Sequence, residues 1–331
     1  MKLGVGLFPT APMGVTRELT HLAERLGYTH AWFGDSPNIW REGYVSMAGA
    51  AVGTERIVVG TGVTNATTRH MSVIASTFAT LDEYMPGRVA LGIGTGDSAV
   101  QTMGRKPMTL ANFEQAIADF RTLVGGGEAV ERQSGAGYHL AYSEPRRVPV
   151  YIGASAPRIL RLAGRVADGV ILLVGVDPVF VEAGLRTIEE GAREAGRKLS
   201  DLDIVLWTPA SILPDGKAAR NVVKAHVGRV VIRPLPAELA PEVMQDVQRI
   251  REGYDYYQHM ENVADHGSLV PDSLVEHFAL AGTPEECREQ IRRIASTGVN
   301  QMAIVPYVTP GDNRARVIES CAELAAGVVT A

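Results

Sequence analysis

The sequence has 331 residues, of which 46% are hydrophobic and 21% charged, and its formal net charge is −5. This composition is typical of a globular protein with a large core, and an acidic chain without long basic runs is not expected to bind nucleic acid. The chain contains two cysteines without CxxC spacing, no 18-residue apolar run and no signal-peptide pattern, so we expect no disulfide framework, no membrane span and a cytoplasmic location.

Short apolar segments alternate with longer helical segments from one end of the chain to the other. Runs of aliphatic and β-branched residues predict strands, and apolar residues at helical spacing predict helices. In the first half of the chain we predict strands at 2–8, 30–34, 56–63 and 88–94, and helices at 15–27, 44–53, 72–85 and 110–124.

The second half continues this alternation after a glycine-rich loop or small hairpin at 125–148. Eight βα units in one run favour a (β/α)8 TIM barrel over a doubly wound sheet. Residues 214–280 exceed what one crossover requires, so we expect a single domain over 1–331 with a helical insertion there, after the seventh strand. The predicted strands are 148–154, 168–175, 202–213 and 301–306, and the helices are 157–166, 179–196, 283–298 and 313–327.

The chemistry of such barrels lies at the C-terminal ends of the strands. The third strand runs into GTGVTNATTRH (60–70), where small and polar residues stand at the end of a buried strand although they pack poorly. A non-proline cis peptide would suit this glycine-rich bend. His70 is interpreted as a surface residue at the start of the next helix. The pattern raises the question of what this strand end makes room for.

Two further strand ends concern cofactor binding. GIGTGD (92–97) has the wrong glycine spacing for a dinucleotide fingerprint. It is consistent with a tight turn alone, or with backbone that approaches a flat ring and places Asp97 at the rim. GASAP (153–157) begins a helix with Ser155 as a fair N-cap. The N–H groups at that helix start, next to the strand that ends at Gly175, would cradle a phosphate; a capped helix without a ligand is the alternative.

The predicted insertion carries GYDYYQHMENVADHG (253–267), with three tyrosines and two histidines. We favour aromatic packing on the barrel, with a lid or substrate wall as the functional alternative. The histidines are seven residues apart, but no carboxylate or cysteine pattern completes a site, so we predict no metal. The candidates for the substrate pocket are Tyr256 and His259 here and Phe8 at the end of the first strand.

Four segments together resemble a known family. The chain resembles the bacterial-luciferase-like superfamily and, within it, the deazaflavin branch that includes methylenetetrahydromethanopterin reductase and the F420-dependent glucose-6-phosphate and alcohol dehydrogenases. The resemblance implies a TIM barrel that binds coenzyme F420, with FMN as the alternative. The segments are AWFGDS (31–36), the block from Gly60 to Asp97, VPVYIGASAPRILRLAGRVADGVIL (148–172) and LAGTPEECREQI (280–291).

The resemblance also implies positions for the cofactor. A non-prolyl cis peptide at Gly62–Val63 would support the back of the ring, with Thr64 and Asn65 beside it. Asp35 would lie at the polar edge of the ring. The phosphate would be held by backbone N–H groups. The residues implied for the phosphate are Gly153, Ala154, Ser155, Gly175 and Val176.

The sequence departs from the sugar and alcohol dehydrogenases of the family at the catalytic positions. Their histidine after the strand-two aspartate is Ser36 here, their tryptophan fits Trp40, and their glutamate is replaced by Asp97. Without the histidine, alcohol oxidation lacks its general base, which favours the reductive direction. Asp97 is then the candidate proton donor, if burial beside the ring raises its pKa; the alternative is that it only caps the following turn.

Three functions compete at this point. The first is an oxidoreductase that moves hydride between F420 and a small organic substrate, in the reductive direction. The second is an FMNH2-dependent monooxygenase that uses O2 and a partner flavin reductase, and the third is a flavin-binding protein without activity. We expect a homodimer packed through barrel helices, with small residues in 44–53 permitting close approach. The acidic tail of F420 would require a basic groove, for which the candidates are Arg158, Arg161, Lys224, Arg229 and Arg233.

Overall fold

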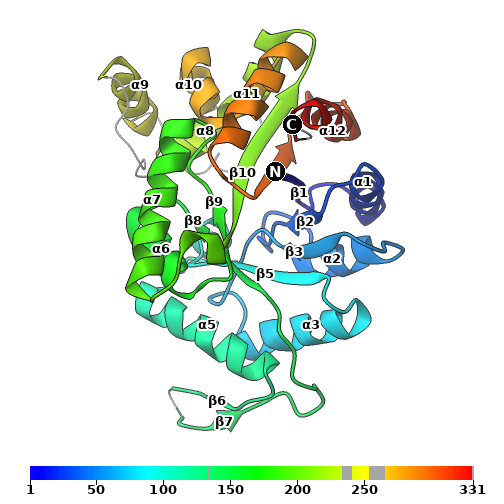
Figure 1. The fold of residues 1–331 in the computed structure, drawn as a ribbon, viewed down its shortest axis with the longest axis vertical. Coiled ribbons are helices and arrows are strands. Elements are labelled where there is room, and N and C mark those ends of the chain that lie inside the picture. Colours follow the sequence, from blue (N-terminus) through cyan, green and yellow to red (C-terminus); the bar gives the residue numbers. More distant parts are fainter. Residues whose placement is uncertain (133, 233–240, 253–264, 330–331) are drawn as a thin grey trace.

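The computed structural model describes residues 1–132, 134–232, 241–252 and 265–329. Eight parallel strands close into a barrel, because β1 pairs with β12 on one side and with β2 on the other, and each further neighbour continues the ring (Figure 1). The predicted (β/α)8 barrel is therefore confirmed. In ring order the strands are β1 (Lys2–Leu7), β2 (His30–Phe33), β3 (Val58–Thr61), β5 (Val89–Gly94), β8 (Val150–Ala154), β9 (Gly169–Leu172), β10 (Asp203–Ile212) and β12 (Gln301–Pro306).

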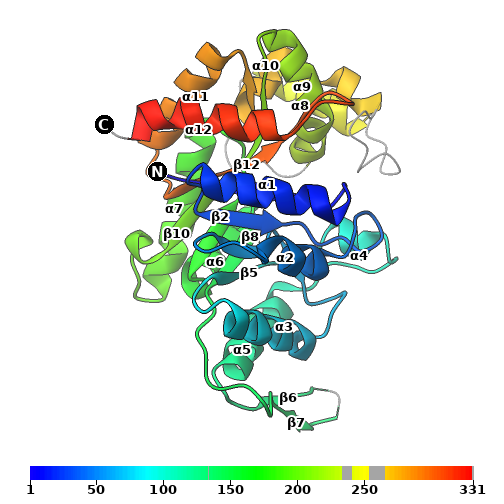
Figure 2. The same ribbon diagram turned by 90° about the vertical axis from the view of Figure 1, so that its right-hand side faces the viewer.

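Helices surround the barrel, and α1 and α12 lie side by side next to the first and last strands (Figure 2). The ends of the predicted helices agree with the structure within about three residues, since the apolar periodicity marks the buried face of each. The helices are α1 (Met13–Arg25), α2 (Gly43–Ala51), α3 (Met71–Tyr84), α4 (Ser98–Gln101), α5 (Leu110–Val124), α6 (Pro157–Val166), α7 (Pro178–Glu194), α8 (Gly216–Val231), α9 (Pro241–Glu252), α10 (Asp272–Phe278), α11 (Pro284–Ser296) and α12 (Ala315–Val329).

Local sequence signals explain where the elements start and how closely they approach. α11 begins with a capping box, in which the Thr283 side chain accepts the N–H of Glu286 and the Glu286 carboxylate accepts the N–H of Thr283. α6 and α7 pack so closely that a Cβ at Gly191 would lie 1.9 Å from the Arg161 carbonyl oxygen. Glycine is therefore required at that contact.

Short strands complete the structure, and the sequence indicated one pair of them. β4 (Thr64–Asn65) pairs with β5, β11 (Leu280–Gly282) extends the sheet beside β10, and β6 (Ala129–Val130) with β7 (Gly137–Tyr138) forms the hairpin predicted within 125–148. Between β10 and β11, the described residues form α8, α9, a 3-10 helix and α10. Within the described residues, no helix has both the length and the apolar character that a membrane crossing requires.

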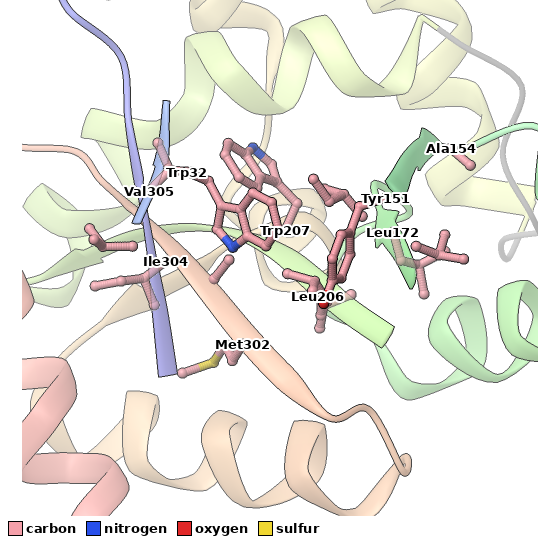
Figure 3. Packing of buried hydrophobic residues seen from close by; sticks show 14 of the residues in the cluster. Trp32, Tyr151, Ala154, Leu172, Leu206, Trp207, Met302, Ile304 and Val305 are labelled. Atoms are coloured by element: carbon pink, nitrogen blue, oxygen red, sulfur yellow. The ribbon is translucent and has the colours of Figure 1, made fainter. Parts of the chain in front are cut away.

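Large buried side chains fill the interior of the barrel (Figure 3). The Trp32 and Tyr151 rings lie 5.0 Å apart, and Trp32 Nε1 donates to Gln301 Oε1 at 2.9 Å. Gln301 Nε2 lies 2.8 Å from His30 Nδ1, and Tyr151 donates to Asp203 at 2.8 Å. Burial lowers the pKa of His30 to about 4, so this ring is neutral. The open space for a ligand lies at the C-terminal ends of the strands.

Candidate active site

A cavity of about 1970 Å³ opens at the C-terminal ends of the barrel strands. Residues at or just beyond the ends of all eight barrel strands line it, which is where TIM-barrel sites are found. It is large enough for a flavin-sized cofactor and a substrate together. The predicted residues among its lining are Phe8, Asp35, Ser36, Trp40, Gly62, Val63, Thr64, Asn65, Asp97, Gly153, Ser155 and Gly175.

The end of the third strand forms a shelf in this cavity. The peptide bond Gly62–Val63 is cis, as the resemblance implied. A Cβ at Gly153 would lie 3.0 Å from Val63 Cγ1 and 3.7 Å from Leu173 Cδ1, and one at Gly94 would lie 3.2 Å from Val63 Cγ2. Gly94 and Gly153 thus give the Val63 side chain room to pack against β5 and β8, because a larger residue at either position would crowd its methyl groups. A flat ring system fits this shelf.

A buried charge network holds the turn after the shelf. The Asp35 side chain is fully buried and accepts hydrogen bonds from Thr64 Oγ1 at 2.7 Å and Arg69 Nη2 at 3.0 Å. Tyr44 donates to Thr64 Oγ1 at 2.8 Å, and the Arg69 guanidinium lies 4.5 Å from the centre of the Tyr44 ring and also contacts Glu42. Burial and the Asp35 charge raise the pKa of Tyr44 well above its usual value. Asp35 therefore holds β4 in place beside the shelf.

The candidate catalytic residues meet at the rim of the same cavity. Asp97 precedes α4, but its side chain makes no helix-capping hydrogen bond; its Oδ1 accepts from Gln101 Nε2 at 3.2 Å. Asp97 therefore occupies the N-cap position of α4 without capping the helix through its side chain. Ser36 Oγ lies 3.3 Å from Ser98 Oγ. Trp40 stacks on Phe8 with ring centroids 4.5 Å apart and forms one wall of the cavity.

The phosphate cradle is smaller than the resemblance implied. Ala154 does not line the cavity, because successive strand residues face opposite sides and its neighbours Gly153 and Ser155 face inward. The N–H of Val176 already donates to the His277 carbonyl oxygen at 2.8 Å, so Val176 is also withdrawn. Gly175 remains, with φ +94°.

The prediction that Ser155 caps α6 is wrong as well. The N-cap is Ala156, and no side chain caps the helix. Ser155 instead lines the cavity beside the start of α6. His70, in contrast, is the N-cap of α3 as predicted, and its ring accepts the N–H of Ser72.

The basic groove predicted for an acidic tail is not assembled as expected. Arg161 pairs with Glu190 and Glu194 on α7, outside the cavity, and Arg158 is exposed and does not line it. Lys224 lines the cavity but pairs with Asp272 at 2.6 Å. Arg229 lines the cavity, and Arg233 lies outside the described residues.

Sequence reasoning missed one polar side of the cavity. The predicted wall residues Tyr256 and His259 lie outside the described residues. The structure instead places Tyr307, directly after β12, in the cavity lining. Reading the eighth strand end as closely as the third would have found Tyr307. The other members of this side are His226, Arg229 and Arg314.

The fold and the cavity define the class of protein: a TIM barrel with a cofactor-sized site at the catalytic face. Residues 3–301 match the family model described as luciferase-like monooxygenase. The chain belongs to this family of enzymes, which confirms the resemblance.

Within this family, the chain is similar to two relatives and to one solved structure that have described activities. The chain is 29% identical to 5,10-methylenetetrahydromethanopterin reductase of Methanolobus tindarius over 95% of this chain and 97% of the relative. It is 35% identical to F420-dependent glucose-6-phosphate dehydrogenase of Microbacterium testaceum over 91% and 89%. The structure of coenzyme F420-dependent tetrahydromethanopterin reductase from Methanopyrus kandleri superposes with a TM-score of 0.79, 27% identity and 97% coverage of both chains.

Proposed function

We propose that this protein is an F420-dependent oxidoreductase that reduces a small organic substrate. The observation that carries the proposal is the cis-peptide shelf at Gly62–Val63 in the cavity, packed against Gly94 and Gly153, with Asp97 also in the cavity lining. The F420-dependent relatives, two of them above 25% identity over nearly the whole chain, support the choice of cofactor. A single barrel domain completes the proposal.

The residues of the chain would hold the cofactor by shape and by backbone groups. The shelf supports the ring from behind, and Asp35 keeps Thr64 in place through its hydrogen bond. Gly153, Ser155 and Gly175 would surround the phosphate. Bound F420 supplies a hydride acceptor or donor at this ring position.

The proton chemistry rests on Asp97. Reduction of a C=C, C=N or C=O bond by hydride requires a proton at the partner atom. Asp97 lines the cavity just beyond the end of β5, where its carboxyl group can face a bound substrate. Ser36 can orient a substrate but is a poor base for alcohol oxidation, because its hydroxyl does not ionise near neutral pH. This asymmetry supports the reductive direction.

We expect Asp97→Asn to lower kcat by about 100-fold or more, since a positioned general acid contributes that much. The measurement is the reoxidation of reduced F420 by a panel of small unsaturated acids, imines and ketones, followed through the absorbance of the oxidised ring. Gln101→Ala is the matched control, because it removes the hydrogen-bond partner and leaves the carboxylate. Wild-type kcat in the Asp97→Asn variant, with unchanged F420 affinity, would refute the donor role.

The second candidate is an FMNH2-dependent monooxygenase that works with a flavin reductase. Ser36 favours it, because a monooxygenase has no need of the base that the alcohol dehydrogenases carry there. Oxygen uptake that requires FMNH2 and is absent with reduced F420 would select this candidate.

We also propose a cytoplasmic homodimer formed through α2. This helix exposes Val45, and Val52 is exposed directly after its last residue, so an apolar surface is available to a second copy. The mass in solution, measured by light scattering, tests this: a monomeric wild type would refute it, and Val45→Glu should dissociate the dimer.

A further inference from the structure

The cavity has a second polar side, opposite the shelf, that the proposed function does not use. It consists of Tyr307, His226, Arg229 and Arg314, and is called the cationic cluster below. Three separate parts of the chain bring these residues together: α8, the end of β12, and the loop that leads into α12. Two guanidinium groups at the wall of one cavity call for a physical reason.

Tyr307 is the centre of the cluster. It is 9% exposed, and its hydroxyl oxygen accepts from Arg229 Nη2 at 3.3 Å and lies 2.8 Å from His226 Nδ1. Because arginine only donates, the tyrosine oxygen accepts from Arg229, and its proton remains for His226 or for a ligand. Arg229 is itself 8% exposed, so this charge has been withdrawn from bulk water.

Arg314 supplies the strongest observation. Its Nη2 donates to Thr10 Oγ1 at 2.8 Å, and it is partly buried at the wall of the cavity. Among the described residues, no carboxylate lies within 4.0 Å of its guanidinium, whereas Arg69, Arg161 and Arg220 all have one. Burial lowers the pKa of Arg314 below its usual range. A desolvated cation of this kind is costly unless an anion compensates it.

We propose that the cationic cluster binds an anionic group of the substrate, so that the substrate is a small organic carboxylate or phosphate. The presence of an anion site follows from the cluster, and the identification of its occupant as the substrate rests on the proposed function. Arginine presents paired N–H donors that match both kinds of anion. Tyr307 adds a hydroxyl donor at the same wall.

The order of the strands separates this cluster from the phosphate cradle of the cofactor. The cradle follows β8 and β9, while Tyr307 follows β12, with β10 between them in the barrel. The shelf after β3 lies on the far side of the ring from β10. An anion held at Tyr307 would therefore place the rest of a small molecule toward the shelf, where hydride transfer is proposed.

The experiment measures anion binding and cofactor binding separately. Inorganic phosphate and glutarate are titrated by calorimetry into wild type, Arg314→Gln, Arg314→Lys and Arg158→Gln, with and without F420. Arg158 is the matched control, because it is an exposed arginine that does not line the cavity. F420 affinity comes from quenching of cofactor fluorescence, and thermal unfolding checks that every variant is folded.

We expect wild type and Arg158→Gln to bind at least one anion, and Arg314→Gln to bind it about 10-fold to 100-fold more weakly, with F420 affinity unchanged. Arg314→Lys should recover part of the loss because it restores the charge without the paired donors. Tighter binding of phosphate than of glutarate would indicate a phosphorylated substrate, and the reverse order a carboxylate.

Two results would overturn the inference. The first is that neither anion binds wild type, or that Arg314→Gln binds as well as wild type. The second is that Arg314→Gln weakens F420 by the same factor as the anion and the two compete, because the cluster would then serve the cofactor's acidic tail. Arginine-dependent anion binding by a protein that does not bind F420 would refute the cofactor proposal and leave the anion site intact.

Discussion

The two ends of the barrel solve opposite problems with the same eight strands. At the N-terminal end, Trp32, Gln301 and His30 form a closed chain of neutral hydrogen bonds, and large rings fill the interior (Figure 3). At the C-terminal end, glycines pack against Val63 of the shelf, and charged side chains such as Asp35 and Arg314 line a cavity. Side chains therefore fill the barrel where the strands start, whereas a cavity that a ligand can enter remains where the strands end.

The largest effect is expected from removing the buried Asp35 charge, which tests whether the stability of the open end depends on it. Asp35→Ala leaves the Arg69 guanidinium without its buried partner and Thr64 without its acceptor. We expect a loss of about 3–5 kcal/mol in the free energy of unfolding, measured with urea. Glu42→Gln is the control, because Glu42 is the more exposed partner of the same arginine. It should cost less than about 1 kcal/mol.

A loss for Asp35→Ala as small as the loss for Glu42→Gln would show that the network contributes little to stability. The open end would then depend on packing alone, as the closed end does.

Gly169 and Gly153 allow the same kind of substitution to be tested at the two ends of the barrel. A Cβ at Gly169, near the closed end, would lie 2.2 Å from Tyr151 Cε1 and 2.7 Å from the Asp203 carbonyl oxygen. We expect Gly169→Ala to cost about 2–3 kcal/mol of stability and to leave the cofactor affinity of the folded protein unchanged. Gly153→Val, at the open end, should cost about 1–2 kcal/mol and weaken F420 binding by about 100-fold, because the added side chain crowds Val63 and shifts the shelf.

Thermal unfolding and fluorescence titration of both variants make this measurement. Equal effects of both substitutions on stability and on binding would mean that the two ends are not functionally separate.

The smallest effect is the pH dependence of the closed end. His30 has its pKa lowered to about 4 in the folded protein, against about 6.5 in an unfolded chain. As the pH falls below 6.5 the unfolded state takes up the proton first, so stability present at pH 7 is lost between about pH 6.5 and pH 4. We expect about 1–2 kcal/mol less stability at pH 5 than at pH 7 from this group.

His30→Gln, which keeps a hydrogen-bonding group beside Gln301, should flatten this dependence. An unchanged pH profile in that variant would show that other groups control the acid sensitivity.

Much of the fold could be predicted because the strand and helix periodicities are local and strong. The cis peptide at Gly62–Val63 also followed, through the resemblance of the 60–97 block. The errors at Ala154 and Val176 came from contacts that no local pattern records. A shift of one residue along a strand turns a side chain away from the cavity, and the N–H of Val176 is taken by His277, about 100 residues away in sequence.

The cationic cluster could not be predicted for the same reason. Arg229 was identified only as a possible tail ligand, and Arg314 and Tyr307 join it only when β12 closes the barrel against β1. Their partners are set by tertiary packing, which the sequence does not show directly.

The central claim is that the shelf binds a deazaflavin ring, and one titration tests it most directly. The purified protein is titrated with F420 and with FMN, and quenching of cofactor fluorescence gives both dissociation constants, with Gly153→Val as the control for the shelf. We predict that F420 binds at least 10-fold more tightly than FMN and that the Gly153→Val variant loses this binding. Tighter binding of FMN than of F420, or F420 binding that Gly153→Val does not change, would contradict the account.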